Sequence, residues 1–165
     1  MLLLEGTAYS LSSGRATPIS NDNLPFVMVT KYEPEYRHRL PAGTSLTLSG
    51  LPDVFKRGSV GASGKNGYVP FSVYGRFASV KVKGAEEMRD VKGTMFGIRS
   101  PKFASEFSYP GTHCSFLSED RTEGGKVEEF EAGDEGGLTV EWAVTGRYHL
   151  GFPHDPSWHD MDLEA

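Results

Sequence analysis

Three residues in the second half of the chain, His113, Ser115 and Lys126, carry side chains that are useful in a catalytic site. In the segment "THCSFLS", His113 and Ser115 are two residues apart, so on a β-strand they share a face while Cys114 points to the other side. An imidazole can transfer a proton, and an ammonium group can stabilise a developing oxyanion. We therefore predict that His113 and Ser115 lie on one face of a strand, and we consider Lys126 as a candidate cation.

Each of these residues also has a structural interpretation. His113 can instead be a core or surface histidine whose hydrogen bonds are satisfied, and Lys126 can form a surface salt bridge with Glu128 or Glu129. A lone cysteine is more often a small core residue than a nucleophile. We therefore interpret Cys114 as part of the core.

Other candidate residues are weaker. His149, His154 and His159 follow one another at intervals of five residues in the tail, and this spacing matches no standard metal-ligand motif. Arg99, in the segment "GIRSP", is interpreted as structural. The sequence therefore predicts no bound metal and no other cofactor.

The composition predicts one globular domain over residues 1–165. A chain of 165 residues with 38% hydrophobic and 12% aromatic residues can build one compact core. The last residues contain two prolines and no hydrophobic periodicity, so residues 146–165 are expected to form an extended C-terminal arm. The opening "MLLLEG" is too short for a membrane span and has no basic segment before it, which argues against a signal peptide.

The charge balance restricts the partners. The 22 acidic residues outnumber the 17 basic ones and the net charge is −5, so nothing favours nucleic-acid binding, which requires clustered basic residues. The single cysteine excludes an internal disulfide and points to the cytoplasm. We expect a small-molecule substrate and no membrane partner, and we leave open whether the chain forms a homodimer.

Frequent glycines and prolines separate short segments rich in valine, phenylalanine, tyrosine and threonine, which is typical of a β protein. The predicted fold is α+β but predominantly β, with a mixed or antiparallel sheet or half-barrel and little helix. A helical turn is expected only around 48–58, beginning after Pro52, and 61–67 is expected to be a loop. The predicted strands are 2–11, 26–30, 71–83, 91–99, 112–118, 126–132, 138–145 and 147–150.

The segment "VKGTMFGIRSPKFASEFSYPGTHCSFLSEDRTEGGKVEEFE" (91–131) resembles the core of the α-acetolactate decarboxylases. In that family, a "GT-hydrophobic-GFR" stretch is followed by "GYHLHF", an acidic loop and "GGHV". The opening "LLLEGTAYSLSSGRATPI" and the segment "FSVYGRFASVKVK" also match family motifs. The resemblance covers most of the chain and implies the fold of that family.

The resemblance implies a zinc enzyme in which three histidines hold the metal and an arginine and carboxylates assist decarboxylation. His113 matches the first of these histidines, but Ser115 and Lys126 stand at the other two positions. The spacing shared with the family, together with strand alternation, therefore predicts that His113, Ser115 and Lys126 face one cavity. Lys83 stands at the position of the arginine, and it can also be one of several charges on its strand. The catalytic glutamate of the family would precede Met1, and a carboxylate of its tail would follow Ala165.

The interpretation that follows is an enzyme of this scaffold that acts without a metal. The substrate would be a keto acid or polyketide-like compound of a biosynthetic pathway, and the reaction a decarboxylation, isomerisation or cyclisation. The proposed site residues are His113, Lys126, Lys83 and Ser115. A non-catalytic binding or regulatory protein is the alternative, and a zinc acetolactate decarboxylase is disfavoured because a hydroxyl and an ammonium are poor zinc ligands.

Overall fold

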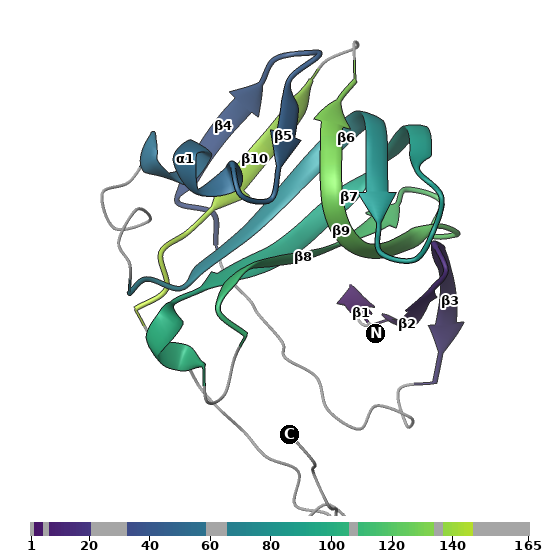
Figure 1. The fold of residues 1–165 in the computed structure, drawn as a ribbon, viewed down its shortest axis with the longest axis horizontal. Helices are drawn as coiled ribbons and strands as arrows, with labels where there is room; N and C mark the ends of the chain where they lie inside the picture. The colour runs from purple at the N-terminus through teal and green to yellow at the C-terminus, as the bar shows by residue number, and fades with distance from the viewer. Residues whose placement is uncertain are drawn as a thin grey trace, which may run out of the picture.

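The chain folds into two antiparallel β-sheets and very little helix (Figure 1). The computed structural model describes residues 2–4, 7–20, 33–58, 66–105, 109–133 and 137–146. Its elements are β1 (Leu2–Leu4), β2 (Thr7–Ser12), β3 (Arg15–Ile19), β4 (Tyr36–Leu40), β5 (Ser45–Thr47), α1 (Leu51–Lys56), β6 (Val69–Val82), β7 (Met88–Ser100), the 3-10 turn η3 (Lys102–Ala104), β8 (Gly111–Ser118), β9 (Gly124–Ala132) and β10 (Leu138–Trp142).

The larger sheet closes on itself. Its seven strands run in the order β4-β10-β6-β7-β8-β9-β5, and β6 also pairs with β9. The first half of β6 pairs residues 71–75 with 138–142 of β10, whereas residues 77–82 pair with 127–132 of β9. Strands β6, β7, β8 and β9 therefore form a small closed ring, and Figure 1 shows β9 curving back across β6.

The change of partner along β6 occurs at Gly75 and a bulge that follows it. Gly75 has φ +140, and a Cβ there would lie 2.8 Å from the carbonyl oxygen of Gly137. The register then shifts between Phe77 and Ser79. Because a bulge bends and twists its strand, β6 can leave β10 and reach β9.

Aromatic side chains fill the interior of the ring. The ring of Phe77 meets Phe116 and Phe130 edge-on, with centroid distances of 5.3 Å and 6.0 Å. All three are buried. The alternation that turns Phe116 and Cys114 into this core turns His113 and Ser115 outward.

Helix α1 covers the inner side of β6 and β10. Phe55 packs against Phe71 at 5.3 Å and against Trp142 at 5.6 Å. The helix begins at Leu51, so the expectation of a start after Pro52 was wrong by two residues. Proline is tolerated in a first turn because the N–H groups there have no helical partner.

The predicted fold class is confirmed. The prediction that four strands are neighbours in one sheet is also confirmed, for the strands predicted at 71–83, 91–99, 112–118 and 126–132. The single strand predicted over 2–11 was wrong, because β1 pairs back on β2 with Leu2 opposite Tyr9. The strand predicted over 138–145 ends at Trp142. The predictions for 26–30 and 147–150, for 61–65 of the loop and for 147–165 of the C-terminal arm lie outside the described residues.

Strands β3, β4 and β5 were not predicted. The sequence of β3 contains Pro18, which lowers the β signal, and β4 reads "YRHRL", in which charged residues conceal the alternation. β5 has three residues, too few for any periodicity. No helix in the described part of the chain has the length and apolar character needed to cross a membrane.

The close contact of β7 and β8 predicts a stability effect at Gly97. A Cβ at this residue would lie 2.0 Å from the carbonyl oxygen of His113 and 2.6 Å from the Cβ of Cys114. We expect Gly97→Ala to lower the free energy of unfolding by about 1–3 kcal/mol, measured by urea denaturation. Gly146→Ala is the control, since a Cβ at Gly146 has nothing within 4 Å. Equal stability of the two variants would contradict the described strand contact.

Candidate functional site

The structure brings Ser115 on β8, Lys126 on β9 and Lys83, the residue after the end of β6, into one row. Ser115 on β8 lies directly opposite Lys126 on β9. On the other side of β9, the backbone N–H of Lys83 donates to the carbonyl oxygen of Lys126 at 2.8 Å. The adjacent cross-strand pair, Val82 and Val127, points into the core, and each side chain is 1% exposed. Alternation therefore directs Lys83 and Lys126 outward on the same face as Ser115.

His113 lies on the same outer face, two residues before Ser115, and is half-buried. Diagonal neighbours on adjacent strands are about 7–8 Å apart, which is the expected separation of His113 from Lys126. The Nε2 atom of His113 lies 3.0 Å from the carbonyl oxygens of both Tyr109 and Pro110. Because carbonyl oxygens only accept hydrogen bonds, Nε2 carries a hydrogen and donates it. Nδ1 is then the nitrogen that can exchange a proton with a ligand.

Cys114 points to the opposite side of β8, as predicted. Its side chain is 4% exposed and belongs to the main hydrophobic core. Burial raises the pKa of the thiol, and the nearby positive charge of Lys126 offsets this only in part. The thiol therefore stays protonated at neutral pH and is a poor nucleophile.

Arg99 also faces away from the candidate site. It lies on β7 opposite Thr112, whereas the neighbouring Ile98 lies opposite His113. Arg99 and His113 are therefore on different faces of the sheet. This placement agrees with the structural interpretation of Arg99.

Lys83 and Lys126 are both exposed, and among the described residues neither forms an ion pair. The alternative that Lys126 forms a salt bridge with Glu128 is not seen among the described residues. The carboxylate of Glu128 instead lies 3.9 Å from the Nζ atom of Lys81. If the Lys126 ammonium group is to stabilise an oxyanion in place of a metal ion, it must be partly desolvated. That condition does not hold for the ligand-free chain, so a bound ligand would have to exclude the water.

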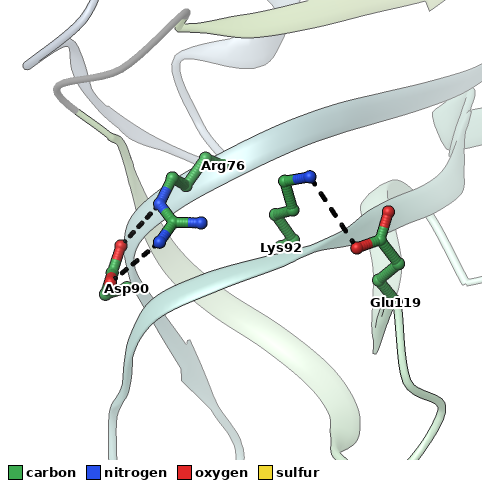
Figure 2. A network of polar contacts seen from close by, with 4 residues as sticks. All are labelled: Arg76, Asp90, Lys92 and Glu119. Carbon is green, nitrogen blue, oxygen red and sulfur yellow. Dashed lines mark hydrogen bonds and ion pairs between the residues drawn. The ribbon is translucent and has the colours of Figure 1, made fainter.

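Two other cations on the outer surface, Arg76 and Lys92, have carboxylate partners. Figure 2 shows Arg76 aimed at Asp90, with Nε and Nη2 donating at 2.8 Å and 3.1 Å, and Lys92 aimed at Glu119, 3.9 Å away. These pairs join β6 to β7 and β7 to the turn that follows β8. In the part of the chain that the structure describes, the lysines at 83 and 126 form no ion pair and so differ from these two cations.

The turn between β8 and β9 fixes the register that puts Ser115 opposite Lys126. Oδ1 of Asp120 accepts hydrogen bonds from the Ser118 hydroxyl at 2.6 Å and from the Thr122 hydroxyl and N–H at 2.9 Å and 3.1 Å. The Ser118 hydroxyl in turn accepts from the N–H of Glu123 at 3.0 Å. These hydrogen bonds lower the pKa of Asp120, the largest effect coming from Ser118.

The small N-terminal sheet packs against β9, the strand that carries Lys126 (Figure 1). Tyr9 and Leu117 pack in one cluster, and Arg121 donates to the Tyr9 hydroxyl at 3.0 Å. At the tip of the β2–β3 hairpin, the carbonyl of Gly14 accepts from the N–H of Gly124 at 2.9 Å. A Cβ on Gly14 would lie 2.8 Å from that of Ala85, so the tip sits beside the segments that carry Lys126 and Lys83.

These supporting residues were not predicted from the sequence. The signal for Asp120 was present in "SEDRT", because an aspartate between hydroxyl residues is typical of a side-chain-stabilised turn. No local pattern links Tyr9 or Gly14 to residues more than a hundred positions away. Those contacts exist only in the folded chain.

The side chains in this row do not fit a zinc site. Zinc in proteins needs three or four nitrogen, sulfur or carboxylate ligands. Here Nε2 of His113 is already held by two carbonyl groups, the Ser115 hydroxyl is a weak ligand, and the Lys126 ammonium repels a cation. Within the described ranges, no three histidine, cysteine, aspartate or glutamate residues are grouped so that they could hold a metal ion.

The chain is similar in sequence to known alpha-acetolactate decarboxylases. A family model described as alpha-acetolactate decarboxylase matches residues 80–165. The alpha-acetolactate decarboxylase of Methanosarcina mazei is 30% identical, with 99% of this chain and 61% of that protein aligned. The Bacillus subtilis alpha-acetolactate decarboxylase is 25% identical over 97% of this chain and 68% of its own. The chain thus spans about three fifths of the Methanosarcina protein.

Solved structures agree on the fold. A crystal structure of acetolactate decarboxylase from Bacillus subtilis subspecies spizizenii superposes with a TM-score of 0.75 at 23% identity, covering 98% of this chain and 75% of the other. A Staphylococcus aureus protein of unknown function, described as similar to alpha-acetolactate decarboxylase, gives 0.71 at 19% identity, covering 87% and 67%.

The Asp120 turn predicts a pH-dependent stability effect. The folded-state pKa of Asp120 lies below the unfolded value, so its contribution is present above that unfolded value, about 3.9, and is lost as the pH falls through the folded value. We expect Asp120→Asn to melt at a lower temperature than the parent chain at pH 7, and the difference to shrink below about pH 4. The control is Glu86→Gln in the β6–β7 turn. A difference that is the same at pH 7 and pH 3 would contradict the charge-based explanation.

Proposed function

The chain belongs to the α-acetolactate decarboxylase family, and on that basis we propose that it is an enzyme that converts a small organic acid without a bound metal ion. The observation that carries the proposal is the row of Ser115, Lys126 and Lys83 on one outer face, with His113 beside it. Two ammonium groups, a hydroxyl and an imidazole are together sufficient for acid–base and oxyanion chemistry.

The proposed reaction proceeds through an enolate. In a 3-keto acid that loses CO2, the electron pair of the breaking C1–C2 bond forms the C2–C3 double bond of an enolate, and the oxygen of the C3 carbonyl group becomes negatively charged. The Lys126 ammonium would stabilise that oxygen, and Lys83 would hold the carboxylate before it leaves. Isomerisation and cyclisation of keto compounds use the same type of anion, so all three reactions remain within the proposal.

His113 would supply the proton. Its Nε2–H is held by the carbonyl oxygens of Tyr109 and Pro110, which fixes the orientation of the ring. The proton carried by Nδ1 of the imidazolium would then pass to the carbanion carbon, and the Ser115 hydroxyl would hold a substrate oxygen. Because lysine carries a compact point charge on a flexible stem, it can follow the substrate oxygen as charge develops there.

We further propose that the substrate is a keto acid or a polyketide-like compound and that the enzyme works in a cytoplasmic biosynthetic pathway. The support is chemical: the face is positively charged and carries no thiol nucleophile, since Cys114 is buried on the other side. Such a face suits an anionic substrate that can form an enolate.

One alternative has an observation in its favour. Lys83 and Lys126 are both exposed, and an open cationic face could bind a small acid without converting it. A non-catalytic binding protein on the same scaffold would bind the acid reversibly and release no CO2 from it. The assays below separate the two functions.

The metal content of the purified protein provides a direct test. We expect well below one zinc per chain by elemental analysis, even after incubation with zinc sulfate and dialysis, because Ser115 and Lys126 are poor zinc ligands. We also expect EDTA to leave the melting temperature unchanged. About one zinc per chain, together with a lower melting temperature in EDTA, would instead indicate a zinc enzyme.

The role of Lys126 can be tested by CO2 release from α-acetolactate and a panel of keto acids. With a substrate identified, we expect Lys126→Met to lower kcat by roughly 10²-fold, in the range seen when one oxyanion-stabilising donor is lost, with a smaller change in KM. Lys126→Arg should restore only part of the rate because the guanidinium group differs in shape.

Two variants serve as controls for that experiment. Lys81→Met removes a cation that is paired with Glu128, and Cys114→Ser changes the opposite face of β8. Both should retain most of the activity per folded molecule. Full activity in Lys126→Met would rule out the proposed oxyanion role, and no turnover of any keto acid would favour the binding protein.

A further inference from the structure

Lys83 and Lys126 form a like-charge pair across two strands. Their backbones are joined by the hydrogen bond from the Lys83 N–H to the Lys126 carbonyl, and both side chains point outward. Residues opposite each other on antiparallel strands have Cβ atoms about 4.5–5.5 Å apart, and like charges in this arrangement destabilise the sheet. The chain therefore maintains an arrangement that is unfavourable for its own stability.

Several other basic residues of this sheet have acidic partners. Described ion pairs on the same sheet are Arg37 with Glu141, Arg76 with Asp90, Lys81 with Glu128 and Lys92 with Glu119. Lys81 lies near the end of β6, two residues before Lys83 in the turn that follows, so acidic partners are accessible to this region. Within the described ranges, the lysine pair nevertheless has no carboxylate partner.

We propose that Lys83 and Lys126 together bind a dianion, and that the ligand of this face is a short dicarboxylic acid. The inference deepens the proposed function, because it assumes that the same face is the substrate site. The Lys126 ammonium has three N–H donors, so it can bind the second carboxylate and the keto oxygen together. Two ammonium groups on flexible stems, rooted on adjacent strands, can each bind one carboxylate of a molecule that lies across the strands. A monocarboxylate would leave one of the two charges uncompensated.

The surrounding backbone favours a dicarboxylate over a phosphate group. Phosphate sites commonly use free backbone N–H groups at helix N-termini or glycine-rich turns. Here the N–H of Lys83 is donated to Lys126, and the N–H of Gly124 is donated to Gly14. Long side chains on different strands therefore remain as the donors, which suits two separated carboxylates.

The ligand class can be tested by calorimetry with succinate, butyrate and inorganic phosphate at low ionic strength. Succinate and butyrate have the same number of carbons but differ by one carboxylate. We expect succinate to bind at least tenfold more tightly than butyrate, and Lys83→Met and Lys126→Met each to remove that preference. Lys81→Met, the matched control, should keep it.

A second readout does not depend on any ligand. In low salt, Lys83→Met and Lys126→Met should each raise the melting temperature by about 1–3 °C, because each removes the repulsion, and high salt should abolish the gain. Lower melting temperatures for both variants would show that the lysines stabilise the fold and would overturn the inference.

The remaining outcomes are also decisive. Equal binding of succinate and butyrate, tighter binding of phosphate than of succinate, or an equal loss of binding in Lys81→Met would each overturn the dicarboxylate assignment. These measurements need no turnover. A chain that binds succinate through both lysines but converts no keto acid would support this inference while refuting the proposed enzyme.

Discussion

The pairing of β6 with β9 is the constraint on which the rest of the structure depends. Without it, β6, β7, β8 and β9 would be an open meander, and the side chains of Phe77, Phe116 and Phe130 could not meet. The pairing is available only because β6 leaves β10 at Gly75 and bulges before Ser79. The same closure puts the end of β6 next to the start of β9, and so places Lys83 beside Lys126.

The outer face of this ring is organised by local turns. The Asp120 turn sets the register of β8 and β9, and the tip of the N-terminal hairpin contacts both Gly124 and Ala85. These supports are built from short hydrogen bonds and from glycines that permit close approach. The reactive side chains therefore project from regular strands, and the polar residues around them hold those strands in register.

A cationic face of this kind can replace only part of what a metal ion does. A metal polarises an oxygen by direct coordination, whereas an ammonium group acts through hydrogen bonds and charge. Exposure weakens the second effect because water screens the charge. If the chain is an enzyme, ligand binding must supply the desolvation that the free structure lacks, since Lys83 and Lys126 are exposed without it.

The sequence by itself determined the β-rich character, the four central strands and the sidedness of His113, Cys114 and Ser115, because these follow from residue type and a period of two. It also identified the family, since the motif around His113 and Lys126 is local. The division of the N-terminal segment into β1 and β2, the short strands β4 and β5 and the helix start at Leu51 were not predicted, because local patterns there are weak or brief. Only the tertiary structure decided that Lys83 lies beside Lys126 and that Tyr9 supports Arg121. Those contacts join residues far apart in sequence, and they form only when β6 meets β9 and the N-terminal sheet packs onto the ring.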